Sequence, residues 1–307
     1  MSAVPAQFSV PERLAETVRA SGGERGAAWL AALPGTVAGH LTDWGLTLER
    51  IGRPGGGPSL IGYVRRADLT PAVLKAGLTT PATAPAHAAL AHWDGRGAVL
   101  LLEADPAAGV LLLERLSGDI PLRSLAEAKA MLEATSLLSR LWVPPDEGHP
   151  FPLVADHVAR LSDGLRRRRD LPGAADAGPL VDEALAAAAG LLADEPERLL
   201  LHGDFHHGNV LAADRAPWLA ISPRPLVGER AYDLAWLARD RLDTLAGSPG
   251  PRGAARRRLH QLADAVEVDH DRLRGWTLFR AVEAGLRSLE AGDPGTAELY
   301  LEFADWL

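Results

Sequence analysis

The sequence of 307 residues is long enough for one large domain or two lobes, and its 47% hydrophobic and 23% charged residues indicate a globular protein. The formal net charge of -8 argues against a nucleic-acid-binding protein, and the absence of cysteine excludes disulfides, thiolate metal sites and cysteine nucleophiles. No apolar run reaches the roughly 18–20 residues of a membrane helix, and residues 1–16 have no basic segment followed by an apolar stretch. We therefore expect a cytoplasmic protein that binds neither nucleic acid nor membrane.

The first third of the chain has a helical segment followed by strands. Residues 11–48 have helical periodicity that is interrupted by Gly-containing turns. A short helix ends at Leu90–Trp93. The apolar runs that predict strands are Leu46–Ile51, Leu60–Arg65, Ala72–Ala76, Ala98–Leu102 and Val110–Leu113. This order predicts a mostly antiparallel sheet with one inserted helix.

After Leu116 the periodicity becomes helical. The predicted helices are Leu122–Leu141, Val154–Arg169, Val181–Leu192, Tyr232–Leu245, Arg256–Val266 and Trp276–Ala291. Strands followed by helices indicate an α+β chain with a sheet lobe and a helical lobe. Four consecutive arginines, Arg166–Arg169, are predicted to form a solvated helix end rather than an anion site.

Residues 198–222 carry the densest group of chemically useful side chains. The apolar run Leu199–Leu201 leads into His202-Gly203-Asp204, and two short strands follow, joined by a turn at residues 214–217. A symmetric hairpin of that kind places Asn209 opposite Ser222, with Cβ atoms roughly 5 Å apart. In phosphoryl transfer a carboxylate accepts the substrate hydroxyl proton, and an amide oxygen five residues later holds magnesium. Asp204 and Asn209 have that spacing.

A rival interpretation of this loop is a metal hydrolase. The side chains of His202, Asp204, His206 and His207 are suitable ligands for zinc or manganese. The chain has no second compact His/Asp cluster that would complete such a site. We expect His202 to order the loop through hydrogen bonds instead.

Three features of the strand-rich region suit a nucleotide. The Gly-rich turn Gly52–Ser59 can lie over phosphates and offer backbone N–H groups and the Ser59 hydroxyl, although a lone Gly-rich turn is more often a plain turn. Lys75, one of only two lysines in the sequence, ends an apolar strand from which its ammonium can reach the α- and β-phosphates. The apolar run Val110–Leu116 joins the two predicted lobes and suits an adenine ring, or is a plain core strand.

These segments resemble the streptomycin 6-phosphotransferase and hydroxyurea phosphotransferase group of the aminoglycoside phosphotransferase superfamily. The resemblance covers nearly the whole chain. Its matching segments include HWDGRGAVLLLEAD (92–105), GVLLLERL (109–116), LLHGDFHHGNVL (200–211) and VGERAYDLAWL (227–237). It implies a protein-kinase-like fold with an N-terminal lobe at residues 1–116, which includes the sheet, and a larger helical lobe at 117–307.

The resemblance also implies functional roles. Asp204 would be the catalytic base and Asn209 a magnesium ligand. Lys75 would hold the phosphates of ATP, and the backbone of Glu114 and Leu116 would hold adenine.

Two positions depart from the family pattern. Ser222 stands where the family has the aspartate that is its main magnesium ligand, and Glu229 is one possible substitute. Ala86, with His87 beside it, stands where the family has a glutamate that pairs with the strand lysine. The resemblance further implies that Asp233 braces the catalytic loop.

The function expected from the sequence is ATP- and magnesium-dependent phosphorylation of a hydroxyl group on an aminoglycoside-like antibiotic or a related small molecule. The alternative is a pseudokinase that binds nucleotide or small molecule without efficient transfer, because Ser222 and Ala86 weaken the site. Acidic residues of the helical lobe, Asp156, Asp240 and Glu283, are candidates for acceptor binding.

Overall fold

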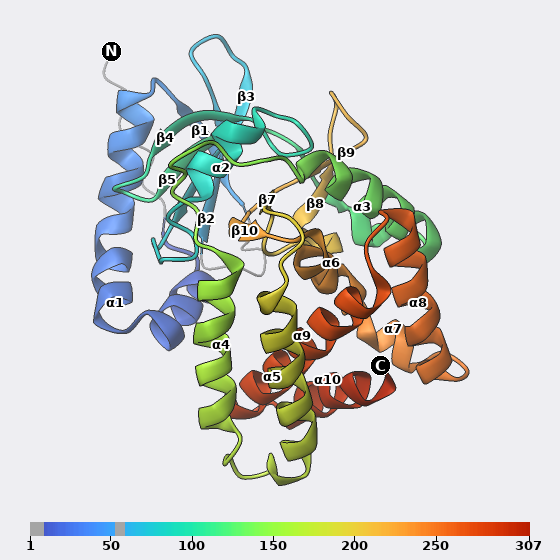
Figure 1. Ribbon diagram of the computed structural model, residues 1–307. Helices are drawn as coiled ribbons and strands as arrows, with labels where there is room; N and C mark the ends of the chain where they lie inside the picture. Colours follow the sequence, from blue (N-terminus) through green and yellow to red (C-terminus); the bar gives the residue numbers. More distant parts are fainter. Residues whose placement is uncertain (1–8, 53–58) are drawn as a thin grey trace. The chain divides into compact units, whose positions relative to one another are not determined.

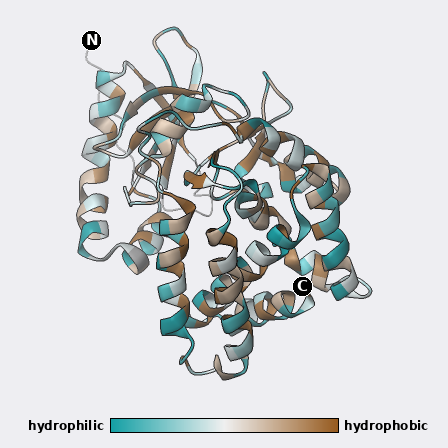
Figure 2. Cartoon of the chain, in the orientation of Figure 1, coloured by the Kyte–Doolittle hydropathy of each residue, from teal (hydrophilic) through white to brown (hydrophobic). Residues whose placement is uncertain are grey.

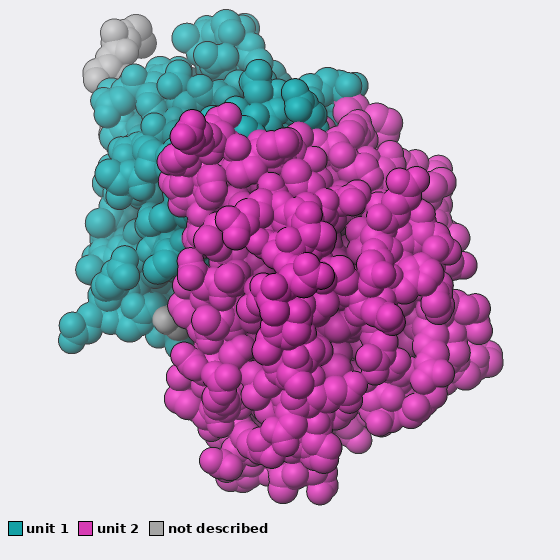
Figure 3. All heavy atoms as spheres, in the orientation of Figure 1, with its two compact units in different colours: residues 1–118, 213–215 teal, residues 119–212, 216–307 magenta. Residues whose placement is uncertain are grey.

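The computed structural model describes residues 9–52 and 59–307. Residues 53–58 of the predicted Gly-rich turn Gly52–Ser59 lie outside the described residues. The chain divides into two compact units, which Figure 3 shows in different colours. Unit 1 contains residues 1–118 and 213–215, and unit 2 contains residues 119–212 and 216–307. Three residues between two strands of unit 2 therefore belong to unit 1.

Unit 1 contains one antiparallel sheet, as the sequence predicts. Its strands are β1 (Thr47–Ile51), β2 (Ser59–Arg65), β3 (Pro71–Gly77), β4 (Leu101–Asp105) and β5 (Val110–Glu114). They lie in the order β1-β2-β3-β5-β4, so β3 is central. The inserted helix is α2 (Ala86–Trp93).

Helix α1 (Glu12–Asp43) covers one face of this sheet (Figure 1). It is interrupted at Gly23, whose φ of 53° and ψ of -146° are not helical, as the predicted Gly-containing turns require. The core formed by helix and sheet includes Leu14, Val18, Leu33, Val37, Leu60, Leu74 and Leu112. Along β3 the residues alternate between this core and the opposite face.

Unit 2 is mainly helical. Its helices are α3 (Glu127–Leu141), α4 (Val154–Arg168), α5 (Gly178–Ala193), α6 (Arg230–Ala238), α7 (Leu242–Ala246), α8 (Pro251–Ala265), α9 (His270–Glu290) and α10 (Pro294–Trp306). The long helix α9 is buried along most of its length and packs against α4, α5, α6, α8 and α10. Hydrophilic and hydrophobic residues alternate along α4 in Figure 2, as expected for a helix with one exposed face. No helix within the described residues is long and apolar enough to cross a membrane.

Two predicted helices are divided in the structure, α8 and α9 begin at Pro251 and His270 rather than at Arg256 and Trp276, and one helix was missed. The segment Leu122–Leu141 begins as a short 3-10 turn, Leu122–Ser124, before α3. The segment Tyr232–Leu245 is two helices, α6 and α7, because Arg241 adopts a left-handed conformation with φ of 55°. Helix α10 was not predicted at all.

Short strands of unit 2 carry the loop of interest. Strand β7 (Leu199–Leu201) pairs with β10 (Leu226–Gly228), and β8 (Val210–Ala212) pairs with β9 (Trp218–Ala220). Strand β6 (Ser117–Pro121), which spans the boundary between the units, lies beside β8.

The predicted hairpin register was wrong by one residue. Val210 pairs with Ala220, so the connection comprises residues 213–217 rather than 214–217. Asn209 therefore lies opposite Ile221, whose N–H donates to the Asn209 carbonyl at 2.8 Å. Ser222 is the next residue along, not the direct partner of Asn209. The prediction includes Ala213 in the strand that begins at Asn209. In the structure Ala213 is not paired in the β8–β9 ladder, so every partner is shifted by one residue.

Candidate active site

The chain turns sharply at Gly203, directly after the buried strand β7. Gly203 has a φ of 74°, and a Cβ atom at this position would lie 1.9 Å from the carbonyl oxygen of Arg224. The two segments are also joined by the Arg224 N–H, which donates to the His202 carbonyl at 2.9 Å. Only glycine fits this conformation and this close backbone approach. The turn brings Asp204 out of the strand.

Asp233 braces this turn, as the resemblance implies. Its Oδ1 accepts a hydrogen bond from the Gly203 N–H at 2.9 Å, and its Oδ2 accepts from the His202 N–H at 2.9 Å. The indole N–H of Trp142, at the end of α3, also donates to Oδ2 at 3.1 Å. Asp233 lies in the first turn of α6 and is completely buried. Burial raises the pKa of Asp233, while the three donated bonds favour its ionised form.

Asp204 is held from two directions. Its carboxylate oxygen lies 3.2 Å from Nε of Arg224, and its side chain is 13% exposed. The Asp204 N–H donates to Nδ1 of His202 at 3.3 Å, so Nε2 of that ring carries the proton that is donated to the Ile221 carbonyl at 3.0 Å. His202 therefore links the loop to the end of β9, which confirms its expected ordering role.

Asn209 is oriented by the same loop. Its Nδ2 donates to the Asp204 carbonyl at 2.9 Å. The amide oxygen then remains as the acceptor that could hold a cation. Ser222 follows the partner of Asn209 and has a φ of 58°, an uncommon conformation for a residue other than glycine. Small or short polar side chains are tolerated there, and the serine hydroxyl is one oxygen that could bind magnesium. The residues present thus fit the cation in part.

The histidines of the loop are engaged within the protein. The backbone N–H and Nδ1 of His207 both donate to Asp240, at 2.7 and 2.6 Å. Burial pushes the pKa of Asp240 upward, but these two bonds outweigh it and lower the pKa to about 2. Nδ1 of His206 accepts the Gly208 N–H at 3.1 Å. Across residues 9–52 and 59–307, no three His, Cys, Asp or Glu side chains gather as metal ligands, so the metal-hydrolase interpretation gains no support.

The other candidate carboxylates are differently placed. Glu283 is buried and accepts a hydrogen bond from Arg287 at 3.2 Å. Asp156 is exposed in the first turn of α4. Of the three predicted acceptor-binding residues, Asp240 and Glu283 therefore already have cationic or N–H partners.

Glu229 does not provide a replacement magnesium ligand. Its two carboxylate oxygens accept hydrogen bonds from Nε and Nη2 of Arg272, at 2.5 and 2.6 Å. The indole N–H of Trp276 donates to one of them at 2.6 Å, and Glu229 is only 3% exposed. A carboxylate with these partners is part of the core. The suggestion that it substitutes for the missing aspartate was wrong.

In unit 1, Ser59 and Lys75 lie on the same face of the sheet. Lys75 of β3 is paired with Ile61 of β2 and Leu111 of β5, and Ser59 is two residues before Ile61. The alternate residues of β3, such as Leu74, enter the core beneath α1. Helix α2 begins at Ala86 and has no acidic residue in its first turn, so the family glutamate has no equivalent there.

The segment Glu114–Leu116 is held by its side chains. The Glu114 carboxylate accepts hydrogen bonds from Arg215. The guanidinium of Arg115 donates to the carbonyls of Ala72 and Val64 and pairs with Glu49 at 2.7 Å. The side chains of Glu114 and Arg115 are therefore committed to unit 1.

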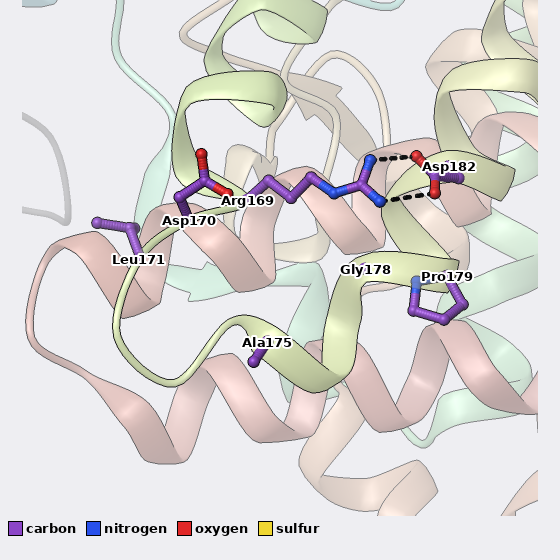
Figure 4. A pocket seen from close by; sticks show the side chains of 7 residues that line it. All are labelled: Arg169, Asp170, Leu171, Ala175, Gly178, Pro179 and Asp182. Atoms are coloured by element: carbon purple, nitrogen blue, oxygen red, sulfur yellow. Dashed lines mark hydrogen bonds and ion pairs between the residues drawn. The ribbon is translucent and has the colours of Figure 1, made fainter.

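The basic run at the end of α4 is neutralised by carboxylates. Figure 4 shows Arg169 reaching Asp182 beside a surface pocket, with Nη2 2.8 Å from a carboxylate oxygen. Arg166 pairs with Asp163 at 2.9 Å. Arg168 pairs with Glu290 at 2.7 Å. This is the arrangement of a solvated helix end, which confirms the prediction.

Comparison with known proteins identifies the family. A model of the family described as aminoglycoside/hydroxyurea antibiotic resistance kinase matches residues 44–292. The chain belongs to this family. Proteins similar to this chain include the streptomycin 6-kinase of Streptomyces griseus, which is 36% identical over 313 residues that cover 97% of this chain and 96% of that protein. The hydroxyurea phosphotransferase of Kitasatospora aureofaciens is 37% identical over 322 residues, covering 99% and 87%.

A solved structure supports the fold. The thermostable mutant of aminoglycoside phosphotransferase APH(4)-Ia in ternary complex with ADP and hygromycin B matches with a TM-score of 0.57. The sequence identity is 14%, and the match covers 86% of this chain and 95% of that chain. The α+β, protein-kinase-like fold expected from the sequence is thus confirmed.

Sequence reasoning missed several contacts of this site. Asp240 accepts a hydrogen bond from His207 of the loop, 33 residues away in the chain, and Trp142 donates to the bracing Asp233, 91 residues away. Arg224 contacts Asp204. Of the predicted site residues, Asp204, Asn209 and Ser222 lie together in unit 2, whereas Ser59, Lys75, Glu114 and Leu116 lie in unit 1.

Proposed function

We propose that this chain is an ATP-dependent phosphotransferase that phosphorylates a hydroxyl group of an aminoglycoside-like antibiotic or a related small molecule. The observation that carries the proposal is the braced loop of residues 202–209. In it Asp233 holds the backbone on both sides of the turn, and Asn209 is bonded to the carbonyl of Asp204. A carboxylate and an amide oxygen on one rigid loop are what phosphoryl transfer from ATP uses. Membership of the kinase family supports the same reaction.

In this proposal Asp204 accepts the proton of the acceptor hydroxyl. Arg224, 3.2 Å away, fixes the direction of the carboxylate. Asn209 and Ser222 would hold magnesium, which when bound neutralises charge on the phosphates. Asp156, which is exposed on α4, is the candidate that remains for a cationic group of the acceptor.

The proposed nucleotide site belongs to the N-terminal part of the chain. Lys75 and Ser59, on one face of the sheet, would contact the phosphates, and the backbone of Glu114 and Leu116 would contact adenine. We assign nucleotide binding to residues 1–116 and acceptor binding with the catalytic loop to residues 117–307. Use of ATP agrees with the cytoplasmic location that we propose.

A pseudokinase is the second candidate, and the environment of Ser222 is the observation that favours it. Glu229 is committed to Arg272, so it does not replace the missing aspartate. A charged metal ligand is worth several kcal/mol, which corresponds to a loss of roughly a hundred- to ten-thousand-fold in rate. The serine hydroxyl recovers part of this. Transfer that is slow but measurable is therefore the expected behaviour.

The test combines a product screen with two variants. The wild-type protein, Asp204→Asn and Ser222→Asp are each incubated with ATP and magnesium, and with a panel of aminoglycosides, amino sugars and hydroxyurea. Phosphorylated products are detected by mass shift, and binding of the non-hydrolysable analogue AMP-PNP is measured by calorimetry. We expect the wild type to form product slowly and Ser222→Asp to form it at least about a hundred-fold faster. Asp204→Asn should form none.

The outcomes separate the candidates. Nucleotide binding without product from the wild type, together with product from Ser222→Asp, identifies a pseudokinase whose defect is the missing ligand. Equal product from the wild type and Asp204→Asn contradicts the assigned base. No nucleotide binding by any of the proteins rejects both candidates.

A further inference from the structure

The tip of the β8–β9 hairpin ends in an arginine with an unusual number of partners. Residues 213–215 belong to unit 1, although both strands of the hairpin belong to unit 2. The guanidinium of Arg215 makes five hydrogen bonds within unit 1. Nη1 donates to the Gly95 carbonyl at 2.7 Å, and Nη2 donates to the Ala98 carbonyl at 2.7 Å. Nε and Nη2 donate to the Glu114 carboxylate at 2.6 to 3.0 Å.

The turn after α2 is shaped around this guanidinium. Asp94, Gly95 and Gly97 have φ values of 44°, 75° and 70°, which turn the carbonyls at this place. A Cβ atom on Gly95 would lie 3.2 Å from Nη2 of Arg215, in a backbone conformation that strains other residues. These residues belong to the WDGRG segment, residues 93–97, which is part of a segment that resembles the family. Its glycines allow the chain to wrap around one side chain of a distant hairpin.

Glu114 carries the effect of Arg215 to the proposed adenine site. Its Oε1 also accepts the Leu100 N–H at 2.7 Å, and its own N–H donates to the Leu100 carbonyl at 3.0 Å. It is the last residue of β5, and its backbone and that of Leu116 are proposed to bind adenine. Arg215 therefore fixes both carboxylate oxygens of Glu114 at the residue where β5 ends.

We propose that Arg215 is a positioning residue for nucleotide binding. The side chain fixes the Glu114–Leu116 backbone in the conformation that contacts adenine. Arg215 follows strand β8, which begins directly after Asn209, a proposed magnesium ligand. Arg215 therefore contacts the proposed adenine segment and is also joined through β8 to a proposed magnesium ligand. This inference rests on the proposed function, because it concerns the same nucleotide.

Arginine is specifically required for this role. A planar guanidinium offers five donors in a fixed fork, whereas lysine offers a compact point charge. Two carbonyls and a carboxylate, each accepting from a different nitrogen of the fork, match arginine alone. The Arg215 and Glu114 side chains are 39% and 20% exposed, so the ion pair itself contributes little to folding. The main effect of losing it is therefore expected in ligand binding.

The experiment measures magnesium–AMP-PNP affinity by calorimetry for the wild type and for Arg215→Ala, Arg215→Lys and Arg166→Ala. Arg166 is the matched control, an exposed arginine paired with Asp163 on α4. We expect a roughly tenfold weaker affinity for Arg215→Ala, an intermediate loss for Arg215→Lys and no change for Arg166→Ala. Where product is formed, KM for ATP should rise by the same factor while KM for the acceptor stays constant.

A double-mutant cycle identifies the route. The cycle compares Arg215→Ala, Glu114→Gln and the double variant. If Arg215 acts through Glu114, the fold-loss of nucleotide affinity in the double variant should be smaller than the product of the fold-losses in the two single variants. Hydrogen exchange of residues 94–100 should increase in Arg215→Ala whether or not the protein turns over.

Each result decides the inference. Unchanged nucleotide affinity in Arg215→Ala, with faster exchange in residues 94–100 or a lower unfolding midpoint, assigns Arg215 a purely structural role and overturns the proposal. A parallel rise in KM for ATP and for the acceptor overturns it as well. A wild-type protein that binds no nucleotide overturns the proposed function and with it this role, whereas binding with unchanged variant affinity overturns the positioning role alone.

Discussion

The substitution Asp233→Asn tests whether the buried carboxylate is what holds the catalytic loop. Asparagine has the same shape but only one acceptor oxygen. With that oxygen in the place of Oδ2, it keeps the bonds from His202 and Trp142 and turns its NH2 group toward the Gly203 N–H. The opposite orientation loses two bonds instead of one.

The cost follows from this count. The Gly203 N–H and the asparagine NH2 group are then two buried donors without acceptors, and each costs about 1–3 kcal/mol. Because the variant no longer buries a charged carboxylate, part of this cost is offset. We expect a loss of about 2–4 kcal/mol in the free energy of unfolding, within the roughly 5–15 kcal/mol of a folded domain. The protein should fold, but Gly203 should be released. A misplacement of Asp204 by about 1 Å is then enough for a roughly hundredfold loss in turnover.

The assay pairs this variant with Trp142→Phe. That change removes one donor to Asp233 and leaves both loop bonds intact. Denaturant unfolding should show a loss of stability in both variants, whereas hydrogen exchange of residues 202–209 should increase only in Asp233→Asn. Turnover should follow the exchange. Equal loop protection in Asp233→Asn and the wild type, or an equal loss of turnover in Trp142→Phe, would refute the bracing argument.

Three further predictions concern the same unit. Gly203→Ala should lower the free energy of unfolding by at least about 3 kcal/mol, because its Cβ would clash with the Arg224 carbonyl at a φ of 74°; a wild-type urea midpoint would contradict this. Burial and nearby arginines lower the pKa of His157 from 6.5 to about 4. Between pH 6.5 and 4 His157 is protonated in the unfolded chain but neutral in the folded protein. The free energy of unfolding should therefore fall by up to about 3 kcal/mol as the pH is lowered through this range. His157→Gln should flatten that part of the pH profile, and an unaltered profile would count against the shift. Glu229→Gln should cost about 2–4 kcal/mol by breaking its buried pair with Arg272, without changing the magnesium dependence of AMP-PNP binding; a changed dependence would restore Glu229 as a ligand.

Local sequence patterns predicted the elements that local physics determines. The apolar run Ala72–Ala76 predicted β3, in which Ala72, Leu74 and Ala76 are buried and alternate with less buried residues. Helix α10 was missed, although Asp293 caps it by accepting the Thr296 N–H and Pro294 occupies its first turn. Those are recognised signals of a helix start. The hairpin register was missed because it depends on whether Ala213 stays in the ladder.

The site was predicted only where its residues are close in sequence. Asp204 and Asn209 lie on one loop, so their spacing contained the information. The contacts that hold them come from Trp142 at the end of α3, from Asp233 in α6 and from Asp240 between α6 and α7. No periodicity or motif spacing encodes a hydrogen bond over 91 residues, because such a contact depends on how helices pack.

The backbone at Ser222 decides how its substitution will behave. The left-handed φ of 58° is imposed by the chain around it, since Ile221 is bonded to Asn209 and Arg224 is bonded to His202 on either side. Aspartate is among the residues that adopt this conformation most readily, more so than serine. Ser222→Asp therefore adds a carboxylate at a turn whose geometry is already fixed and which accepts that residue without added strain. Any change in transfer rate that it produces reports on the charge of the metal ligand and not on refolding of the turn.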